Sequence, residues 1–414
     1  MIVRRPRQCR HGVTRRVLWA ALACATPALH AATFTWLGLG NSNNWVDNSG
    51  NWSSSSPDPY PGYLSLHDGV VLPAVSQGYQ ITLFGNFAID GVSVGAPYVL
   101  TVTGGLILQQ AVSGDGLAIN LLGGNVLFKV SSSAGSTTIS GDHDSELAFL
   151  DNATAATADI ESAGLVTFQG NATASNASLS LIGGSLDVSG MASPLTLGAL
   201  HDTLASPGSL ILGSTSLTLQ SAADQIFHGS VAGSGVLTQA GAGRLTLSGN
   251  NETFAGSLIV QAGALQLDGD FSVAPVSVQG GASLRGGGRV GTVSLFDGTL
   301  APGGGAGVSL RVASLACTDA QIVFDLDASA RLVIDQALAV SQCPQWHITL
   351  TASQPIASAQ SFNVATLSSG TDYTLADISI TPPAGHTARA SREGNDIVVT
   401  LYDPADEIFG DSFD

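Results

Sequence analysis

The densest group of side chains able to do chemistry occupies residues 141–146, which read Gly-Asp-His-Asp-Ser-Glu. Asp142, Asp144 and Glu146, together with His143, could hold a divalent cation through carboxylate oxygens and an imidazole nitrogen. Their spacing, however, differs from the Asp-x-Asp-x-Asp-Gly order of calcium loops and from the Gly-rich nonapeptide of calcium-binding solenoids. We therefore interpret the group as a solvated corner between strands, and predict no metal site and no cofactor.

Acid–base attack on an acidic polysaccharide is a second candidate chemistry. Asp142, Asp144, Asp151 and Glu161 could line one face of a sheet, but such sites also need Lys or Arg to bind the uronate. Beyond residue 31 the chain contains only Lys129 and seven scattered arginines, so few basic residues are available to bind a uronate. The sequence thus favours a non-enzymatic protein with no catalytic residues, and a β-helical polysaccharide lyase or glycoside hydrolase is the alternative.

Three tryptophans near the start of the chain allow two interpretations. Trp36, Trp45 and Trp52 stand among asparagines, and Trp and Asn often contact bound sugars, so these rings are candidate glycan-contact residues. Large rings would also cover the open interior at the end of a coiled β-fold. We favour a cap and keep glycan contact as the alternative.

Most of the chain consists of short strands that alternate apolar and polar residues between tight corners. In the stretch 233–267, Leu245 and Leu247 alternate with polar residues, as do Leu265 and Leu267, and Gly or Asn-Asn closes each run. A period of two indicates strands with one buried face, and Gly and Asn indicate corners. Such units recur about every 20–25 residues without helices, which is typical of solenoids. We predict an all-β fold, a right-handed parallel β-helix with a small C-terminal β cap.

The same stretch contains four short motifs: GSGVLT at 233–238, GAGRLTLSGNN at 241–251, TFAG at 253–256 and VQAGAL at 260–265. With these motifs it resembles the autotransporter-associated β-strand repeat found in passenger domains of Gram-negative autotransporters. This resemblance implies an exported β-helical passenger and names no catalytic residue. Autotransporters continue from the passenger into a membrane barrel, whereas here only residues 402–414 follow the last expected strand. We therefore expect a passenger-type protein that lacks the C-terminal barrel, with a remnant of a longer autotransporter as an alternative.

Composition and the start of the chain indicate an exported protein. Only 11% of the 414 residues are charged and the net charge is −17, whereas about a quarter of the residues are charged in ordinary globular domains. An acidic chain repels nucleic acid, so we predict no nucleic-acid partner. Residues 1–31 combine an Arg-rich start with an apolar run, which predicts a signal peptide read by the export machinery. No other run is long enough for a membrane helix. We expect an extracellular or outer-surface location, with the periplasm as the alternative.

Cys317 and Cys343 are the only cysteines beyond residue 31. An even pair in an exported chain predicts one disulfide, and two free buried thiols are the alternative.

The last residues carry a further resemblance. Ile408, Phe409, Asp411 and Phe413 belong to an acidic ending similar to the short tails of some exported Gram-negative proteins, which implies a sorting signal. A frayed terminus is the alternative interpretation.

These observations divide the chain into five segments and predict a role. We predict a structural or adhesive protein that presents loops on a rigid rod to a surface glycan or another cell-surface partner. The segments are a signal peptide (1–31), a Trp/Asn-rich N-terminal cap (32–61), the β-helix (62–316, with the repeat at 233–267), C-terminal rungs and cap (317–401) and an acidic tail (402–414).

Overall fold

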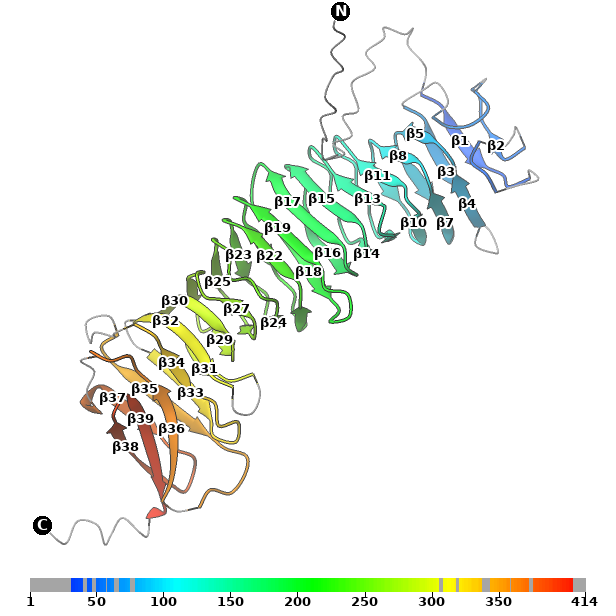
Figure 1. Ribbon diagram of the computed structural model, residues 1–414. Helices are drawn as coiled ribbons and strands as arrows, with labels where there is room; N and C mark the ends of the chain where they lie inside the picture. Colours follow the sequence, from blue (N-terminus) through cyan, green and yellow to red (C-terminus); the bar gives the residue numbers. More distant parts are fainter. Residues whose placement is uncertain are drawn as a thin grey trace, which may run out of the picture.

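The protein is a long rod of stacked β-strands (Figure 1). The rod is a parallel β-solenoid of about 13 turns, with antiparallel strands at its C-terminal end. The prediction of an all-β parallel solenoid with a C-terminal β cap is therefore confirmed. The computed structural model describes residues 31–39, 43–46, 50–56, 58–62, 67–74, 79–304, 308–317, 320–336, 343–357, 359–371 and 375–404.

A small N-terminal sheet begins the rod. Its strands are parallel except that β2 runs antiparallel to β1. In spatial order they are β2 (Trp52–Ser53), β1 (Thr33–Trp36), β3 (Gly69–Leu72), β6 (Val92–Val94) and β9 (Val112–Ser113).

An early sheet and a late sheet each contain eight parallel strands. The early sheet comprises β5 (Asn86–Ile89), β8 (Gly105–Leu108), β11 (Asn125–Phe128), β13 (Glu146–Phe149), β15 (Leu165–Gly170), β17 (Ser185–Met191), β19 (Ser209–Gly213) and β22 (Ser230–Gly233). The late sheet comprises β21 (Gln225–Phe227), β24 (Arg244–Leu247), β26 (Ala264–Leu267), β29 (Ser283–Gly286), β31 (Thr299–Pro302), β33 (Ala320–Asp325), β35 (Trp346–Thr351) and β37 (Ile378–Thr381), the last preceded by a 3₁₀ turn, η1 (Leu375–Asp377).

A long sheet follows the rod through most of its length. Its strands pair in parallel up to β36, and β39 and β38 then add in antiparallel fashion. Its strands are β4 (Tyr79–Leu83), β7 (Tyr98–Val102), β10 (Leu117–Leu121), β12 (Thr138–Gly141), β14 (Asp159–Ser162), β16 (Ala174–Leu181), β18 (Leu195–Asp202), β20 (Leu217–Leu219), β23 (Val236–Gln239), β25 (Ser257–Val260), β27 (Asp270–Phe271), β28 (Val276–Gln279), β30 (Arg289–Phe296), β32 (Leu310–Cys317), β34 (Leu332–Ile334), β36 (Gln360–Thr366), β38 (Thr387–Glu393) and β39 (Asp396–Tyr402).

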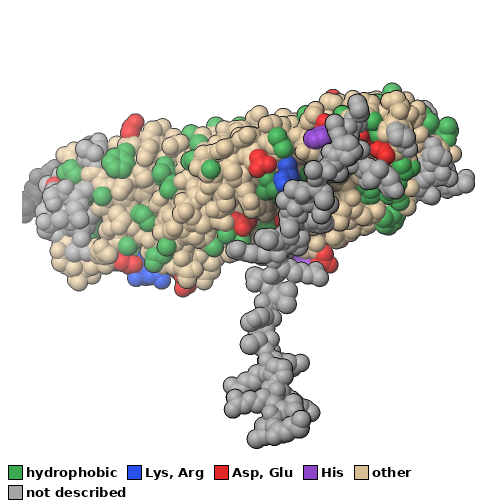
Figure 2. Space-filling model, turned by 90° about the horizontal axis from the view of Figure 1, so that it is seen from above, with side chains coloured by type: hydrophobic (Ala, Val, Ile, Leu, Met, Phe, Trp, Pro, Cys, Tyr) green, Lys and Arg blue, Asp and Glu red, His purple; other side chains and the backbone are tan. Residues whose placement is uncertain are grey.

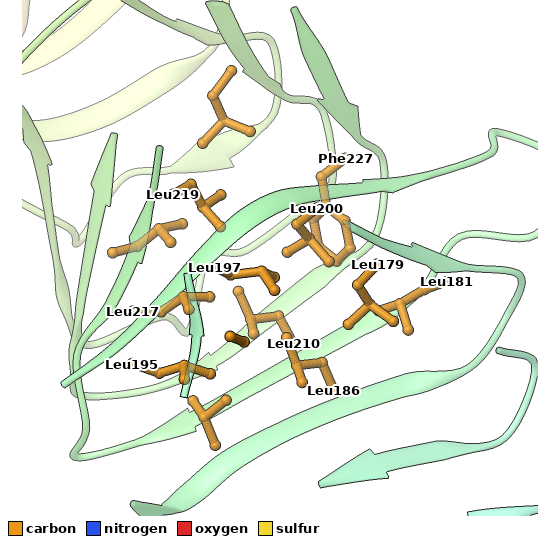
Figure 3. Packing of buried hydrophobic residues seen from close by; sticks show 14 of the residues in the cluster. Leu179, Leu181, Leu186, Leu195, Leu197, Leu200, Leu210, Leu217, Leu219 and Phe227 are labelled. Carbon is orange, nitrogen blue, oxygen red and sulfur yellow. The ribbon is translucent and has the colours of Figure 1, made fainter. Parts of the chain in front are cut away.

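Alternation along each strand separates a core from a polar surface. In β10, Leu117, Ile119 and Leu121 are buried, and the residues between them are half-buried. The register places like residues on top of one another, so that Leu100, Ile119 and Ile139 occupy neighbouring strands of successive turns. Figure 3 shows leucines from several turns pointing into one continuous interior. Burial of these rows supplies the main stabilisation of the rod.

Aromatic rings form a second inward stack. Phe128, Phe149 and Phe168 follow one another on β11, β13 and β15, with ring centroids 4.9 and 4.8 Å apart and nearly parallel planes. The spacing between neighbouring strands is also about 4.8 Å, so identical residues at one position of consecutive turns must stack face to face. Stacked rings therefore hold the turns in register.

The C-terminal end departs from the repeating turn. There β36, β39 and β38 form an antiparallel group whose inward residues Ile397, Val399 and Leu401 are buried. Cys317 at the end of β32 and Cys343 before β35 form the predicted disulfide, with Cα atoms 4.5 Å apart. The disulfide joins neighbouring turns just before this group begins.

Candidate functional site

The three tryptophans form the packed interior of the N-terminal sheet. Trp36, Trp45 and Trp52 are 1%, 0% and 6% exposed. The ring of Trp52 lies 4.9 Å from Trp36 and 4.8 Å from Trp45 in edge-to-face contacts. A sugar stacks on an exposed ring face, and these rings offer none, so we assign no glycan contact to them.

The residues around Trp45 also close the first edge of the long sheet. Trp45 N donates to Thr82 O at 2.9 Å, and Thr82 N donates to Asn43 O at 2.8 Å. These bonds satisfy backbone groups of β4 that would otherwise form an open edge. This geometry is what a cap requires.

Side-chain amides hold the corners of the stretch 233–267. Gln239, 3% exposed, donates from Nε2 to Gly241 O and Gly243 O at 2.9 Å each. The amide therefore braces a tight corner by binding two of its carbonyls, of which Gly243 O also accepts from Ala264 N of the next turn at 3.3 Å. Such a polar group is stable in the interior only because its donors are used.

Asn251 also uses a buried side-chain amide to bind backbone groups, and it joins two turns. Its side chain is 3% exposed. Its Oδ1 accepts from Val231 N of the preceding turn at 2.5 Å, and its Nδ2 donates to Gly249 O at 3.0 Å. The neighbouring Asn250 is exposed, and its side chain donates one hydrogen bond, from Nδ2 to Glu252 Oε1 at 3.1 Å.

Phe254 and Gly256 complete this turn. Phe254 is fully buried and meets Phe271 edge to face at 6.2 Å. A Cβ on Gly256 would collide with the Phe254 ring and with the carbonyl oxygen of Gly235 one turn below. The stretch is thus specialised for close stacking of turns.

The polar group at 141–146 forms a corner after β12. Asp142 accepts at Oδ1 from Gly123 N at 2.9 Å, and Ser145 Oγ donates to Asp142 O at 2.6 Å. Asp142 therefore caps the corner of the turn below. Within the part of the chain that the structure describes, no three His, Cys, Asp or Glu side chains come together in a group able to hold a metal ion.

The carboxylates considered for polysaccharide chemistry lie in different structural settings. Asp151 lies after β13, with φ of 60°, and accepts from Val130 N at 3.0 Å. Glu161 lies in the middle of β14 and is exposed. Asp142 and Asp151 are therefore each used to cap a separate backbone corner.

The Gly-x-Ser-x-Gly pattern that marks a nucleophile elbow occurs at residues 91–95, which read Gly-Val-Ser-Val-Gly. Ser93, however, lies inside strand β6, whereas a nucleophile elbow needs a sharp strand-to-helix turn. The nearby His67 has its Nδ1 atom 3.1 Å from Oδ1 of Asp90, and Asp90 precedes Ser93 by three residues. The regular strand geometry gives no catalytic arrangement here.

A groove on the late sheet brings arginines and a carboxylate together. One hollow of about 340 Å³ is lined by Arg244, Gln266, Arg285, Asp325 and Thr351, with Ala301 and Gly303 among its other walls. Gln266, Arg285 and Ala301 are direct register partners on β26, β29 and β31. The small Ala301 follows two long side chains in this outward row and helps to leave the space open.

A second hollow of about 340 Å³ shares one wall residue, Asp325, with the first. Its other walls include Arg331 and residues 361–364 of β36. We call the two hollows together the arginine groove. Sequence reasoning missed it, although all seven arginines beyond residue 31 lie after residue 243.

Asp327, a carboxylate next to the groove, has a lowered pKa. Asp327 accepts hydrogen bonds at Oδ2 from both Oγ and N of Ser353, each at 2.6 Å. The bond from the Ser353 hydroxyl is the main cause that lowers the pKa of Asp327, and the backbone bond adds to it. The bonds tie the corner after β33 to the end of β35.

Two predicted elements lie outside the described residues. They are the signal peptide, of which only residue 31 is described, and the tail residues Ile408, Phe409, Asp411 and Phe413. The described residues contain no helix that is long and apolar enough to cross a membrane.

Comparison with known families finds one match. Residues 237–267, which cover β23 to β26, match the model of the passenger-associated-transport-repeat. No curated protein matches the chain. The repeat lies within the continuous parallel solenoid, where Gln239, Asn251 and Phe254 form its corners and core. With this repeat on a β-solenoid, the chain is an autotransporter passenger-type protein, and such passengers are exported.

Proposed function

We propose that the protein acts outside the cell, or on its outer surface, as a stiff rod with a structural and adhesive role. The supporting observation is the transport repeat embedded in an uninterrupted stack of parallel turns. About 13 turns at roughly 4.8 Å each give a rod of about 60 Å, long enough to carry a binding surface away from its attachment point.

The polar surface supports a rod more than a single reactive centre. Hydroxyl and amide side chains on successive turns hydrogen-bond along the axis, as in Asn120–Ser140 at 2.8 Å and Thr292–Ser314 at 2.9 Å. Figure 2 shows charged side chains scattered over one long side of the molecule among mostly uncharged ones. These side-chain bonds resist bending, and the backbone pairing between successive turns limits the access of a protease to the chain.

Adhesion of the purified chain tests this proposal. We expect the folded chain to survive protease treatment and to bind cells or immobilised glycans, and the heat-denatured chain to do neither. Rapid proteolysis of the folded chain, or equal retention of folded and denatured chains, would contradict the proposal.

A polysaccharide lyase or hydrolase is the second candidate. It is favoured by the arginine groove, where Arg285 and Asp325 line one hollow. Release of reducing sugar or of unsaturated uronate from a panel of polysaccharides would favour this candidate. Loss of that release in Asp325→Asn, with no change in Asp142→Asn, would place the reaction in the groove.

A further inference from the structure

Five of the seven arginines in the described residues have partners, and two do not. Arg244, Arg289 and Arg311 pair with aspartates at 2.9, 3.8 and 2.7 Å. Arg389 lies over the ring of Tyr402, 5.9 Å from its centroid, and Arg392 donates to Gly394 O. Arg285 and Arg331 form no ion pair or side-chain hydrogen bond with the described part of the chain.

Both unpartnered arginines line the arginine groove, one in each hollow. This location is notable because the protein has 31 acidic residues against 14 basic ones, so counter-ions are plentiful. The only carboxylate common to both hollows, Asp325, accepts from Asp327 N at 3.1 Å. Arg285 and Arg331 are both exposed, so their guanidinium groups are accessible to a ligand in solution.

The solenoid fixes how the two arginines are separated. Arg285 lies on β29, and β31 and β33 are the next two strands of the late sheet. Asp325 ends β33, and Arg331 directly precedes β34 after the corner. Two strand spacings are about 10 Å along the rod, so a ligand that reaches both hollows must be extended and carry more than one anionic group.

We propose that the arginine groove binds a carboxylate-bearing glycan, a linear chain that contains uronic acids. Arg285 and Arg331 bind its carboxylates through paired N–H···O bonds, the geometry for which guanidinium is best suited. Asp325 and Thr351 accept from or donate to sugar hydroxyls between them. The inference rests on the proposed adhesive function and supplies the ligand class for it.

The walls of the groove favour a glycan over an acidic peptide. The hydrogen-bonding walls include Thr351, Ser309, Ser329, Ser361 and Asn363. Charged and polar side chains outnumber the apolar ones, which are Ala301, Ala328 and Ala330 together with Pro302, Val323, Leu326, Phe362 and Val364. A peptide gains affinity from apolar anchors in fitted pockets, whereas a polyhydroxylated chain gains it from many hydroxyl and amide contacts. Acidic peptide is therefore an outcome of the test that would overturn the proposal.

Binding of the full chain to polygalacturonate and alginate tests the proposal, with dextran and polyglutamate as comparison probes. Arg285→Gln and Arg331→Gln are the test variants. Arg289→Gln is the matched control, because Arg289 is exposed on the long sheet and paired with Asp270. Calorimetry or affinity electrophoresis gives Kd, and circular dichroism confirms that each variant is folded.

We expect uronate polymers to bind and dextran to bind much more weakly. Each test substitution should raise Kd by about tenfold or more, the effect of losing one charge-assisted pair, and Arg289→Gln should change it by less than about twofold. Equal binding of polyglutamate, or equal loss in Arg289→Gln, would overturn the proposal. If the chain adheres to cells but not to uronates, this inference fails and the adhesive function stands; if it adheres to nothing, both fail.

Discussion

Replacing Asn251 with alanine should destabilise the turns of the transport repeat by about 2–4 kcal/mol. The side chain is 3% exposed and joins two turns, because it accepts from Val231 N and donates to Gly249 O. Alanine removes both bonds and cannot fill the space left by the amide. Asn250→Ala is the control, since this adjacent asparagine is exposed and bonds only Glu252.

The magnitude follows from the groups left without partners. The buried N–H of Val231 loses its acceptor, which costs about 1–3 kcal/mol, and the bond to Gly249 O contributes about 1 kcal/mol more. The control loses one exposed bond and should change stability by less than about 0.5 kcal/mol. The two variants differ by one position and have the same composition.

Urea denaturation and hydrogen exchange measure the effect. A solenoid unfolds through its nearest-neighbour contacts, so the loss should appear both in the unfolding midpoint and as faster exchange of the Val231 amide. Exchange at a distant turn, such as that of Ile119, should change little. If Asn251→Ala and Asn250→Ala unfold at the same urea concentration, the explanation of the repeat as a set of internal amide braces is wrong.

Three further predictions follow from buried or shifted groups. Asp202→Ala should cost about 3 kcal/mol or more in a urea titration, because its buried carboxylate accepts from Gly208 N and from both N and Nδ1 of His228; an unchanged midpoint would contradict this role. Reduction of the disulfide that closes a separation of 26 residues should cost about 3 kcal/mol, and a Cys317→Ser/Cys343→Ser variant that melts like the oxidised chain would refute it. Ser353→Ala should raise the pKa of Asp327, measured by carboxyl NMR titration. Since this pKa is lowered in the folded state, its stabilisation is present above the unfolded pKa and is lost as pH falls through the folded one.

The fold could be predicted from the sequence because its causes are local. Alternation in runs such as Leu245 and Leu247 decides which side chains face inward, and glycines mark where the chain turns. The disulfide was also predictable, because Cys317 and Cys343 form the even pair of an exported chain. Both inferences need only neighbouring residues or a count.

The burial of single polar or aromatic residues was harder to predict from the sequence. A buried asparagine at 251 and an exposed one at 250 are identical in the sequence, and only the packing of neighbouring turns distinguishes them. The same holds for the tryptophans, since Trp36 suits a sugar platform or a core equally well until its 1% exposure is known. Burial is set by which other segment covers a residue.

The sequence alone therefore determined a repeating strand, an inward face and an exported passenger type, because each depends on a short-range pattern. The tertiary structure decided which outward residues are neighbours. Because turns differ in length, the sequence separation of two residues does not show whether they are neighbours on successive strands. Gln266 lies beside Arg285, and Arg289 beside Arg311, only through the stacking of turns. The arginine groove arises in this way, because Arg285 and Arg331 line hollows that share Asp325 only after the turns between them have stacked.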